Sequence, residues 1–481
     1  VDAYSHVQNL DLEWYEKQKT GNITAILNDD VNQLERFLNG GFNDILQITV
    51  STIAIGSVFF YISPLIALFA ICPIPIILFV ASLFQKKLSP KYLDVRNAAG
   101  DLSSSIFNNL LGIITIKGFT AEQFETNKIL KMSHEYQTKN QDAIKLSSAF
   151  IPIVRMGVLT GFIGTMVIGS VYALKGIIAV GSFSVLVFLT QRFLWPFTRL
   201  GETIDLFERS MASTKRILEL LKTECKITNK KDAVEINHIE KNITFKNVDF
   251  SYSEKEVFNS LNLEIKKESF VGIAGQTGSG KTTLIKLLFR FYELNAGEIK
   301  LDGLNINDVN LESLRSKIGL VNQEIFLFDG TIQENIAYPN SKIDKTLLME
   351  VAKSSQCLEF IEKLDDGFDT LIGERGQRLS VGQKQRIGIA RALYKKPEIL
   401  VFDEATSAVD NETEFLIQKA LKEISKNCTT LVIAHRLSTI KNADKIIVLG
   451  KQSILEEGTH NDLIKNNNFY KHLWDIQTGN N

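Results

Sequence analysis

The longest uncharged stretch, residues 45–85, limits the possible folds of this chain more than any other feature. It contains no Asp, Glu, Lys or Arg and is about twice the ~20 residues that one membrane-spanning helix requires. Ser63-Pro64 lies near its middle, where a turn between two helices would fall. Residues 156–174 and 176–191 are also uncharged. We therefore predict four membrane helices, at about residues 42–63, 64–88, 145–174 and 179–200.

Residues 85–145, from the end of the second predicted helix to the start of the third, are rich in basic residues. Because Lys and Arg accumulate on the cytoplasmic side of membrane proteins, the segment is predicted to lie in the cytosol. Few helix breakers interrupt it, which favours long helices that continue out of the membrane. The basic residues are Lys86, Lys87, Lys91, Arg96, Lys117, Lys128, Lys131 and Lys139.

The overall composition gives no sign of nucleic-acid binding or of a disulfide framework, and it averages over two halves of different polarity. The net charge of −1 gives no indication of a nucleic-acid partner. The 44% hydrophobic share is an average over an apolar first part and a mixed, polar remainder. The four cysteines are far apart, without metal-ligand spacing, and indicate no disulfide framework.

Arg192 is a candidate substrate contact, because a charge inside the membrane is costly and usually faces a bundle interior or a water-filled cavity. It lies about ten residues into the fourth predicted helix, roughly 15 Å deep. The favoured alternative is an interhelical ion pair, or a side chain that reaches the interface. Arg155, near the third helix, is a weaker candidate for the same role.

The rest of the chain is predicted to be an α/β domain. Residues 1–222 form the predicted transmembrane domain, 223–241 a polar linker and 242–481 the soluble domain. Residues 243–250, 261–265 and 270–274 are typical of strands. Apolar strands alternate with helical stretches from there on, which favours a sheet covered by helices.

The strongest chemical motif follows the third of these strands and opens a helix. It fits the phosphate loop G-x4-G-K-[ST], in which glycines allow backbone N–H groups to face phosphate oxygens and the helix N-terminus adds attraction. Lys281 is expected to neutralise the β- and γ-phosphates, and Thr282 to ligate Mg²⁺. The predicted nucleotide-binding residues are Gly275, Gln276, Thr277, Gly278, Ser279, Gly280, Lys281, Thr282 and Thr283.

Residues 399–404 form an apolar strand that ends in two carboxylates. Asp403 at the strand end suits Mg²⁺ coordination, and Glu404 is the candidate general base that polarises the attacking water. An acidic strand end is common by itself, but at this distance after a phosphate loop it indicates ATP hydrolysis.

Residues 373–386, with the core Leu-Ser-Val-Gly-Gln, closely resemble the signature region of ATP-binding cassette (ABC) proteins. The resemblance covers residues 242–470. It implies that Ser380, Gly382 and Gln383 contact an ATP bound to the opposite subunit. Further matches, in the family's order, are an adenine-stacking Tyr252, the glutamine loop and Mg²⁺ contact Gln323, Asp410 after the acidic strand, and the switch histidine His435.

Two upstream segments resemble the intracellular loops of ABC exporters, about residues 14–31 and 112–122. In that family each loop carries a coupling helix that presses on a nucleotide-binding domain. The resemblance implies an exporter half-subunit in the plasma (inner) membrane, with ATP sandwiched between two subunits and hydrolysis driving alternating access. Its cargo, whether drug, lipid or peptide, stays open, and sequence alone does not exclude import.

The sequence departs from the family pattern at two points. Val381 replaces a glycine of the L-S-G-G-Q signature, so a heterodimer with one weakened ATP site is an alternative to the favoured homodimer. Exporter halves have six membrane helices and four are predicted here, as for a chain lacking the first two. A soluble ABC ATPase conflicts with the four helices. A regulatory membrane module without transport is a further alternative, which Glu404 and His435 argue against.

Overall fold

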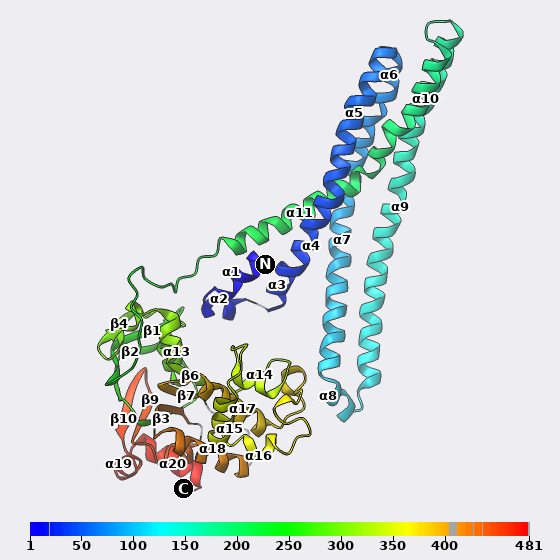
Figure 1. The fold of residues 1–481 in the computed structure, drawn as a ribbon. Coiled ribbons are helices and arrows are strands. Elements are labelled where there is room, and N and C mark those ends of the chain that lie inside the picture. Colours follow the sequence, from blue (N-terminus) through cyan, green and yellow to red (C-terminus); the bar gives the residue numbers. More distant parts are fainter. Residues whose placement is uncertain (19, 404–410, 427, 435, 480–481) are drawn as a thin grey trace. The chain divides into compact units, whose positions relative to one another are not determined.

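The computed structural model of this chain, shown in Figure 1, describes residues 1–18, 20–403, 411–426, 428–434 and 436–479. It divides into two compact units. The first contains Val1–Gln8 and Gln18–Thr223, and the second contains Asn9–Lys17 and Glu224–Asn481. This division differs from the predicted one because residues 9–17 pack with the second unit. The linker segment also packs there, in part through Val234, whose backbone pairs with that of Val309.

The first unit is helical. Four helical stretches are long and apolar enough to cross a membrane: Gly21–Ile62, Pro64–Leu111, Glu122–Leu174 and Val180–Leu221. Each of these stretches overlaps one of the four predicted membrane helices. The first ends at Ser63, whose extended backbone breaks the helix, and Pro64 begins the next at a position where its missing N–H costs nothing.

The helices of this unit, in chain order, are α1 (Asp2–Gln8), α3 (Thr20–Ala25), η1 (Ile26–Asp30), α4 (Val31–Arg36), η2 (Phe37–Gly41), α5 (Phe42–Ile62), α6 (Pro64–Ile71), α7 (Pro73–Leu111), α8 (Ile113–Gly118), α9 (Glu122–Leu174), α10 (Val180–Leu194), η3 (Trp195–Arg199) and α11 (Leu200–Leu221).

Two of these helices extend well beyond a membrane. With 53 residues, α9 is about 80 Å long, whereas the hydrocarbon core is about 30 Å thick. It packs beside α7 over much of its length (Figure 1). The short helix α8 joins them within the predicted loop at residues 112–122.

A buried carboxylate fixes the chain that leads into the first membrane helix. Asp30 is 2% exposed, accepts a hydrogen bond from the Ser213 hydroxyl at 2.8 Å and forms an ion pair with Arg216. Ser213 and Arg216 both belong to α11. The first predicted intracellular loop is therefore tied to the helix that leaves the fourth span.

The second unit contains two sheets. A four-stranded antiparallel sheet has the order β2-β1-β4-β5, and a six-stranded sheet has the order β10-β9-β3-β8-β7-β6. Only β10 is antiparallel to its neighbour in the larger sheet. The strands are β1 (Asn242–Tyr252), β2 (Lys255–Lys266), β3 (Phe270–Gly275), β4 (Ala296–Leu301), β5 (Leu304–Asn305), β6 (Ile318–Val321), β7 (Ile399–Asp403), β8 (Thr429–Ile433), β9 (Lys445–Gly450) and β10 (Ser453–Gly458).

The first two predicted strands belong to the antiparallel sheet rather than to the α/β layer. Only two residues separate β1 from β2, which permits a hairpin but leaves no room for the crossover that parallel strands need. The larger sheet has apolar side chains on both faces, as buried parallel strands require.

A third apolar cluster forms a helical subdomain around α14–α17. The helices of this unit are α2 (Leu12–Lys17), α12 (Lys281–Leu288), η4 (Ile306–Asp308), α13 (Leu311–Ser316), α14 (Ile332–Ala337), α15 (Lys345–Ser354), α16 (Leu358–Ile361), η5 (Gly367–Asp369), η6 (Glu374–Gly376), α17 (Val381–Tyr394), α18 (Asn411–Ile424), η7 (Leu437–Ile440), α19 (His460–Lys465) and α20 (Phe469–Thr478).

Candidate active site

The phosphate loop connects β3 to α12 in a backbone conformation that requires glycine. Gly275 has a φ of +147° and Gly280 a φ of +97°. A Cβ atom at Gly275 would lie 2.4 Å from the Leu449 carbonyl oxygen, and one at Gly280 would lie 2.8 Å from the Phe258 ring. The loop is therefore shaped by both backbone angle and close packing, and glycine-rich loops of this kind can turn backbone N–H groups toward an anion.

The polar side chains of the loop fit a triphosphate. Lys281 is 7% exposed, and its ammonium group donates to the carbonyl oxygens of Gly275 and Gln276, both at 3.0 Å. The Ser279 hydroxyl is buried without a hydrogen-bond partner among the described residues. An ammonium group folded back on its own loop and an unsatisfied hydroxyl beside it are both suited to phosphate oxygens.

The order of the strands in the larger sheet brings the acidic end of β7 next to the phosphate loop. Strands β3, β8, β7 and β6 are parallel, so their carboxyl ends share one edge, where ligands of α/β folds bind. Asp403 ends β7, and its carboxylate accepts a hydrogen bond from the Thr282 hydroxyl at 3.4 Å. Gln323 follows β6 and is exposed. The predicted base Glu404, Asp410 and His435 lie outside the described residues.

The predicted adenine-stacking residue, Tyr252, lies in an aromatic cluster with Phe250 and Tyr292. Its ring makes edge-to-face contacts with Phe250 at 4.9 Å and Tyr292 at 5.1 Å between centroids. The Lys286 ammonium group lies 5.7 Å from the Tyr252 centroid and 5.8 Å from that of Tyr292. Since Lys286 belongs to α12, the helix that the phosphate loop opens also contacts the aromatic cluster.

Sequence reasoning missed a carboxylate that organises this cluster. Glu16, on α2, accepts a hydrogen bond from Lys286 at 2.7 Å and another from the Tyr292 hydroxyl. Burial alone would raise the pKa of Glu16, but these two hydrogen bonds outweigh it and lower the pKa. Burial and the hydrogen bond to Glu16 raise the pKa of Tyr292 far above its ordinary range. Glu16 lies within the segment that resembles the first intracellular loop, but nothing in its spacing points to Tyr292.

The signature residues form the N-terminus of α17 in the helical subdomain. Ser380 caps the helix: its hydroxyl accepts from the Gln383 N–H at 3.3 Å, and its own N–H donates to the Gln383 side chain at 2.9 Å. Val381, 54% exposed, points outward at the first helical position, while Gly382 is buried. The valine therefore leaves the cap intact and places an apolar side chain on the surface beside it.

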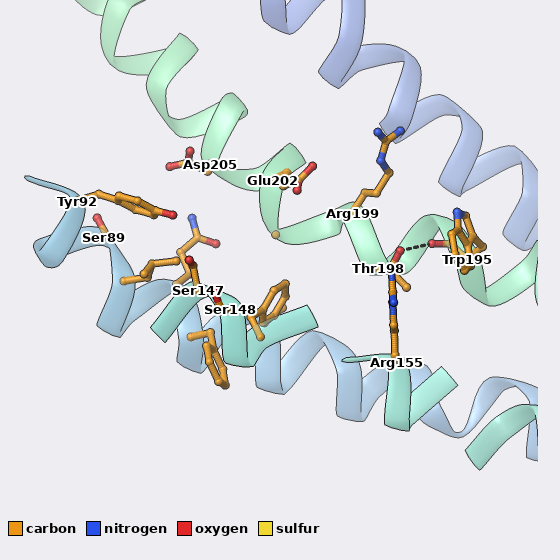
Figure 2. Close-up of a pocket in the computed structure, with 16 residues that line it drawn as sticks. Ser89, Tyr92, Ser147, Ser148, Arg155, Trp195, Thr198, Arg199, Glu202 and Asp205 are labelled. Carbon is orange, nitrogen blue, oxygen red and sulfur yellow. Dashed lines mark hydrogen bonds between the residues drawn. The ribbon is translucent and has the colours of Figure 1, made fainter. Parts of the chain in front are cut away.

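A second candidate site lies in the first unit, as a cavity of about 510 Å³ between α7, α9 and the η3–α11 segment (Figure 2). Arg155 lines this cavity and Arg192 does not. Arg192 is exposed, with its guanidinium group 5.5 Å from the Phe188 ring centroid. The lining residues are Ala81, Phe84, Gln85, Leu88, Ser89, Tyr92, Ser147, Ser148, Phe150, Arg155, Trp195, Thr198, Arg199, Gly201, Glu202 and Asp205.

Comparison with known proteins matches both units. The family described as the ABC transporter transmembrane region matches residues 1–197, and the ABC transporter family matches residues 258–407. The uncharacterized ABC transporter ATP-binding protein YwjA of Bacillus subtilis is 36% identical, over 99% of this chain and 83% of that protein. The ATP-dependent lipid A-core flippase of Escherichia coli K12 is 32% identical, over 99% of this chain and 82% of the flippase.

A solved structure extends the match to the whole fold. The structure of a bacterial Atm1-family ABC exporter with ATP bound has a TM-score of 0.87 and 28% sequence identity, over 99% of this chain and 83% of that one. The order of a helical transmembrane region followed by an α/β ATPase domain is the same. The chain therefore belongs to the ABC transporter family, as an exporter-type subunit with its transmembrane region fused to its ATPase domain.

Proposed function

We propose that two copies of this chain form an ATP-driven exporter in the plasma membrane, with two ATP sites at the interface between their ATPase domains. The observation that carries this proposal is the pairing of Thr282 with Asp403 beside the glycine-shaped loop, in a chain that also holds four membrane-length helices. The relatives named as lipid A-core flippases support a membrane-derived cargo as one candidate class.

In the proposed mechanism, the Lys281 ammonium group leaves the loop carbonyls and contacts the β- and γ-phosphates, while the Ser279 hydroxyl and loop amides hold phosphate oxygens. Thr282 and Asp403 would hold Mg²⁺, with Gln323 as a further ligand, and the ion would supply charge neutralisation when bound. Glu404 accepts a proton from the attacking water, and His435 contacts the γ-phosphate.

The opposite subunit completes each site. Ser380 of the partner subunit and the partner's Gly382 N–H would cap the γ-phosphate from the N-terminus of α17, where backbone N–H groups favour an anion. ATP then binds the closed dimer more tightly than the open one, so binding shifts the equilibrium toward closure and hydrolysis reverses it. The two segments that resemble intracellular loops, about residues 14–31 and 112–122, transmit this change to the membrane helices.

The homodimer makes a direct prediction about Val381. Purified without any partner, the wild-type protein should hydrolyse Mg²⁺-ATP, and Val381→Gly should change the rate by less than about tenfold, because the cap at Ser380 is already formed. ATPase activity in lipid nanodiscs measures this. An inactive wild type that is rescued by Val381→Gly, or by a co-expressed second ABC subunit, would favour the heterodimer instead.

Glu16 is expected to position the adenine-stacking ring. Glu16→Gln removes the charge that holds Lys286 and Tyr292, so KM for ATP should rise about fivefold, equivalent to ~1 kcal/mol, with little change in kcat. Glu13→Gln on the same helix is the matched control, since Glu13 pairs with Lys17 and Lys226 rather than with Lys286 and Tyr292. Equal KM values in the two variants would remove Glu16 from this role.

A further inference from the structure

The last helix of the chain, α20, contacts the segment that follows the switch histidine (Figure 1). This switch segment, residues 436–441, contains the short helix η7. Leu437 and Ile440 of η7 belong to a buried apolar cluster, and one face of α20 packs on the same cluster. Gln477 continues that face one helical turn further along. The residues of α20 in or against the cluster are Phe469, Tyr470, Leu473 and Trp474.

The side chain of Gln477 caps η7. The backbone N–H of Leu437, the first residue of η7, donates to Gln477 Oε1 at 2.8 Å. The first N–H groups of a helix have no partner inside the helix. Arg436 precedes η7 but makes no capping hydrogen bond, since a guanidinium group has donors only. The acceptor therefore comes from a residue 40 positions later in the chain.

The support that carries Gln477 is itself fixed. Tyr470 of α20 is fully buried, and its hydroxyl is hydrogen-bonded to Nδ1 of His460 at 2.9 Å. The Glu456 carboxylate, on β10, accepts hydrogen bonds from the N–H groups of Phe469 at 2.6 Å and Tyr470 at 3.4 Å. The Trp474 ring contacts that of His460, with 4.5 Å between centroids. Helix α20 is thus tied to the edge of the larger sheet, and Gln477 projects from a well-anchored helix.

Two further contacts hold the switch segment. Arg436 forms an ion pair with Glu414 of α18, which is 8% exposed. At the other end, the Lys441 ammonium group lies 5.9 Å from the Trp474 ring centroid. The segment directly follows His435, which lies outside the described residues. Since a displacement of about 1 Å at a reacting group can cost much of its rate, contacts two residues from the histidine matter for hydrolysis.

We propose that Gln477 is a positioning residue for ATP hydrolysis. By capping η7 it fixes the chain that follows His435 and keeps that histidine aligned with the γ-phosphate. This inference rests on the role of His435 under the proposed function and adds the C-terminal helix to the hydrolytic machinery. Because Gln477 acts through the switch segment and not on the nucleotide, its loss lowers kcat and leaves the affinity for ATP unchanged.

Amide hydrogen exchange tests the cap without relying on catalysis. Gln477→Leu keeps the approximate size of the side chain but removes the acceptor, whereas Gln477→Glu keeps an acceptor oxygen. In ATP-free nanodiscs, Gln477→Leu should exchange the amides of residues 436–441 about fivefold faster than the wild type, and Gln477→Glu should match the wild type. Thr478→Ala is the control, since the Thr478 hydroxyl donates to the Trp474 carbonyl oxygen of its own helix. Unchanged exchange in Gln477→Leu, or equal acceleration in Thr478→Ala, would overturn the cap.

Steady-state ATPase tests whether the cap serves hydrolysis. Gln477→Leu should lower kcat about fivefold with an unchanged KM for ATP, while Gln477→Glu and Thr478→Ala stay near the wild type. In a His435→Ala background, Gln477→Leu should cause no further loss, because two residues that act as one unit are not additive. Faster exchange with an unchanged kcat would reduce Gln477 to a structural contact, and an equal further loss in the His435→Ala background would show that it acts elsewhere.

These readouts separate the inference from the proposed function. A wild type that does not hydrolyse ATP, or a His435→Ala variant with normal turnover, would count against the proposed function and its assignment of the switch histidine. Exchange at residues 436–441 would still decide whether Gln477 caps η7.

Discussion

The Glu404→Gln variant is expected to bind Mg²⁺-ATP as tightly as the wild type and to hydrolyse it about 10²–10⁴-fold more slowly. Glutamine keeps the size and hydrogen-bonding capacity of the side chain but cannot accept the proton of the attacking water. The chain position follows Asp403 at the carboxyl end of β7, the edge where Thr282 and the phosphate loop also lie. Steady-state ATPase and equilibrium binding of ATP, measured side by side in nanodiscs, check the prediction.

The control for this variant is Glu362→Gln, an acidic position that ends α16 in the helical subdomain. It should hydrolyse ATP at the wild-type rate. Because closure depends on bound ATP, Glu404→Gln should also accumulate ATP-bound dimer, which cross-linking between the two copies would detect. Near-normal turnover by Glu404→Gln would remove Glu404 from the role of general base and leave proton acceptance to another group.

The Lys281→Ala variant is expected to lose ATP affinity itself, by about 10–100-fold. Its ammonium group now donates to two loop carbonyls at 3.0 Å and would exchange these for charge-assisted hydrogen bonds to phosphate. Isothermal titration with ATP in the absence of hydrolysis measures the change. The loss should be smaller for AMP, which lacks the β- and γ-phosphates that Lys281 is expected to contact.

Lys300→Ala provides a matched control, because Lys300 lies on β4 of the antiparallel sheet and pairs with Glu298. It removes the same charge without touching the loop. If Lys281→Ala and Lys300→Ala bind ATP equally well, the assignment of residues 275–282 as the phosphate loop would be wrong.

The membrane region was predictable because its signal is local. Absence of charge over residues 45–85 is a property of consecutive residues, and the bilayer leaves few alternatives to a helix for such a stretch. The turn at Ser63 and Pro64 was predictable for the same reason, since proline ends a helix or begins one. Helices α7 and α9 continue far into the polar segment, as its scarcity of helix breakers predicts.

The phosphate loop was also predictable, since its chemistry lies in residues 275–282 between one strand and one helix. The pairing of β1 with β2 lay outside what such a local pattern predicts. Both were recognised as strands, but strand pairing depends on the length of the connection, and the short β1–β2 turn selects an antiparallel hairpin.

The sequence by itself determined the four membrane helices, the phosphate loop and the acidic strand end, because each is encoded in neighbouring residues whose backbone geometry they control. Only the tertiary structure decided which distant side chains meet. It brings Thr282 to Asp403, and Glu16 to Lys286 and Tyr292. It also turns Arg155, rather than Arg192, toward a cavity. Such contacts depend on strand order and helix packing, which are set by the sum of many burial contacts across the chain and not by any local pattern.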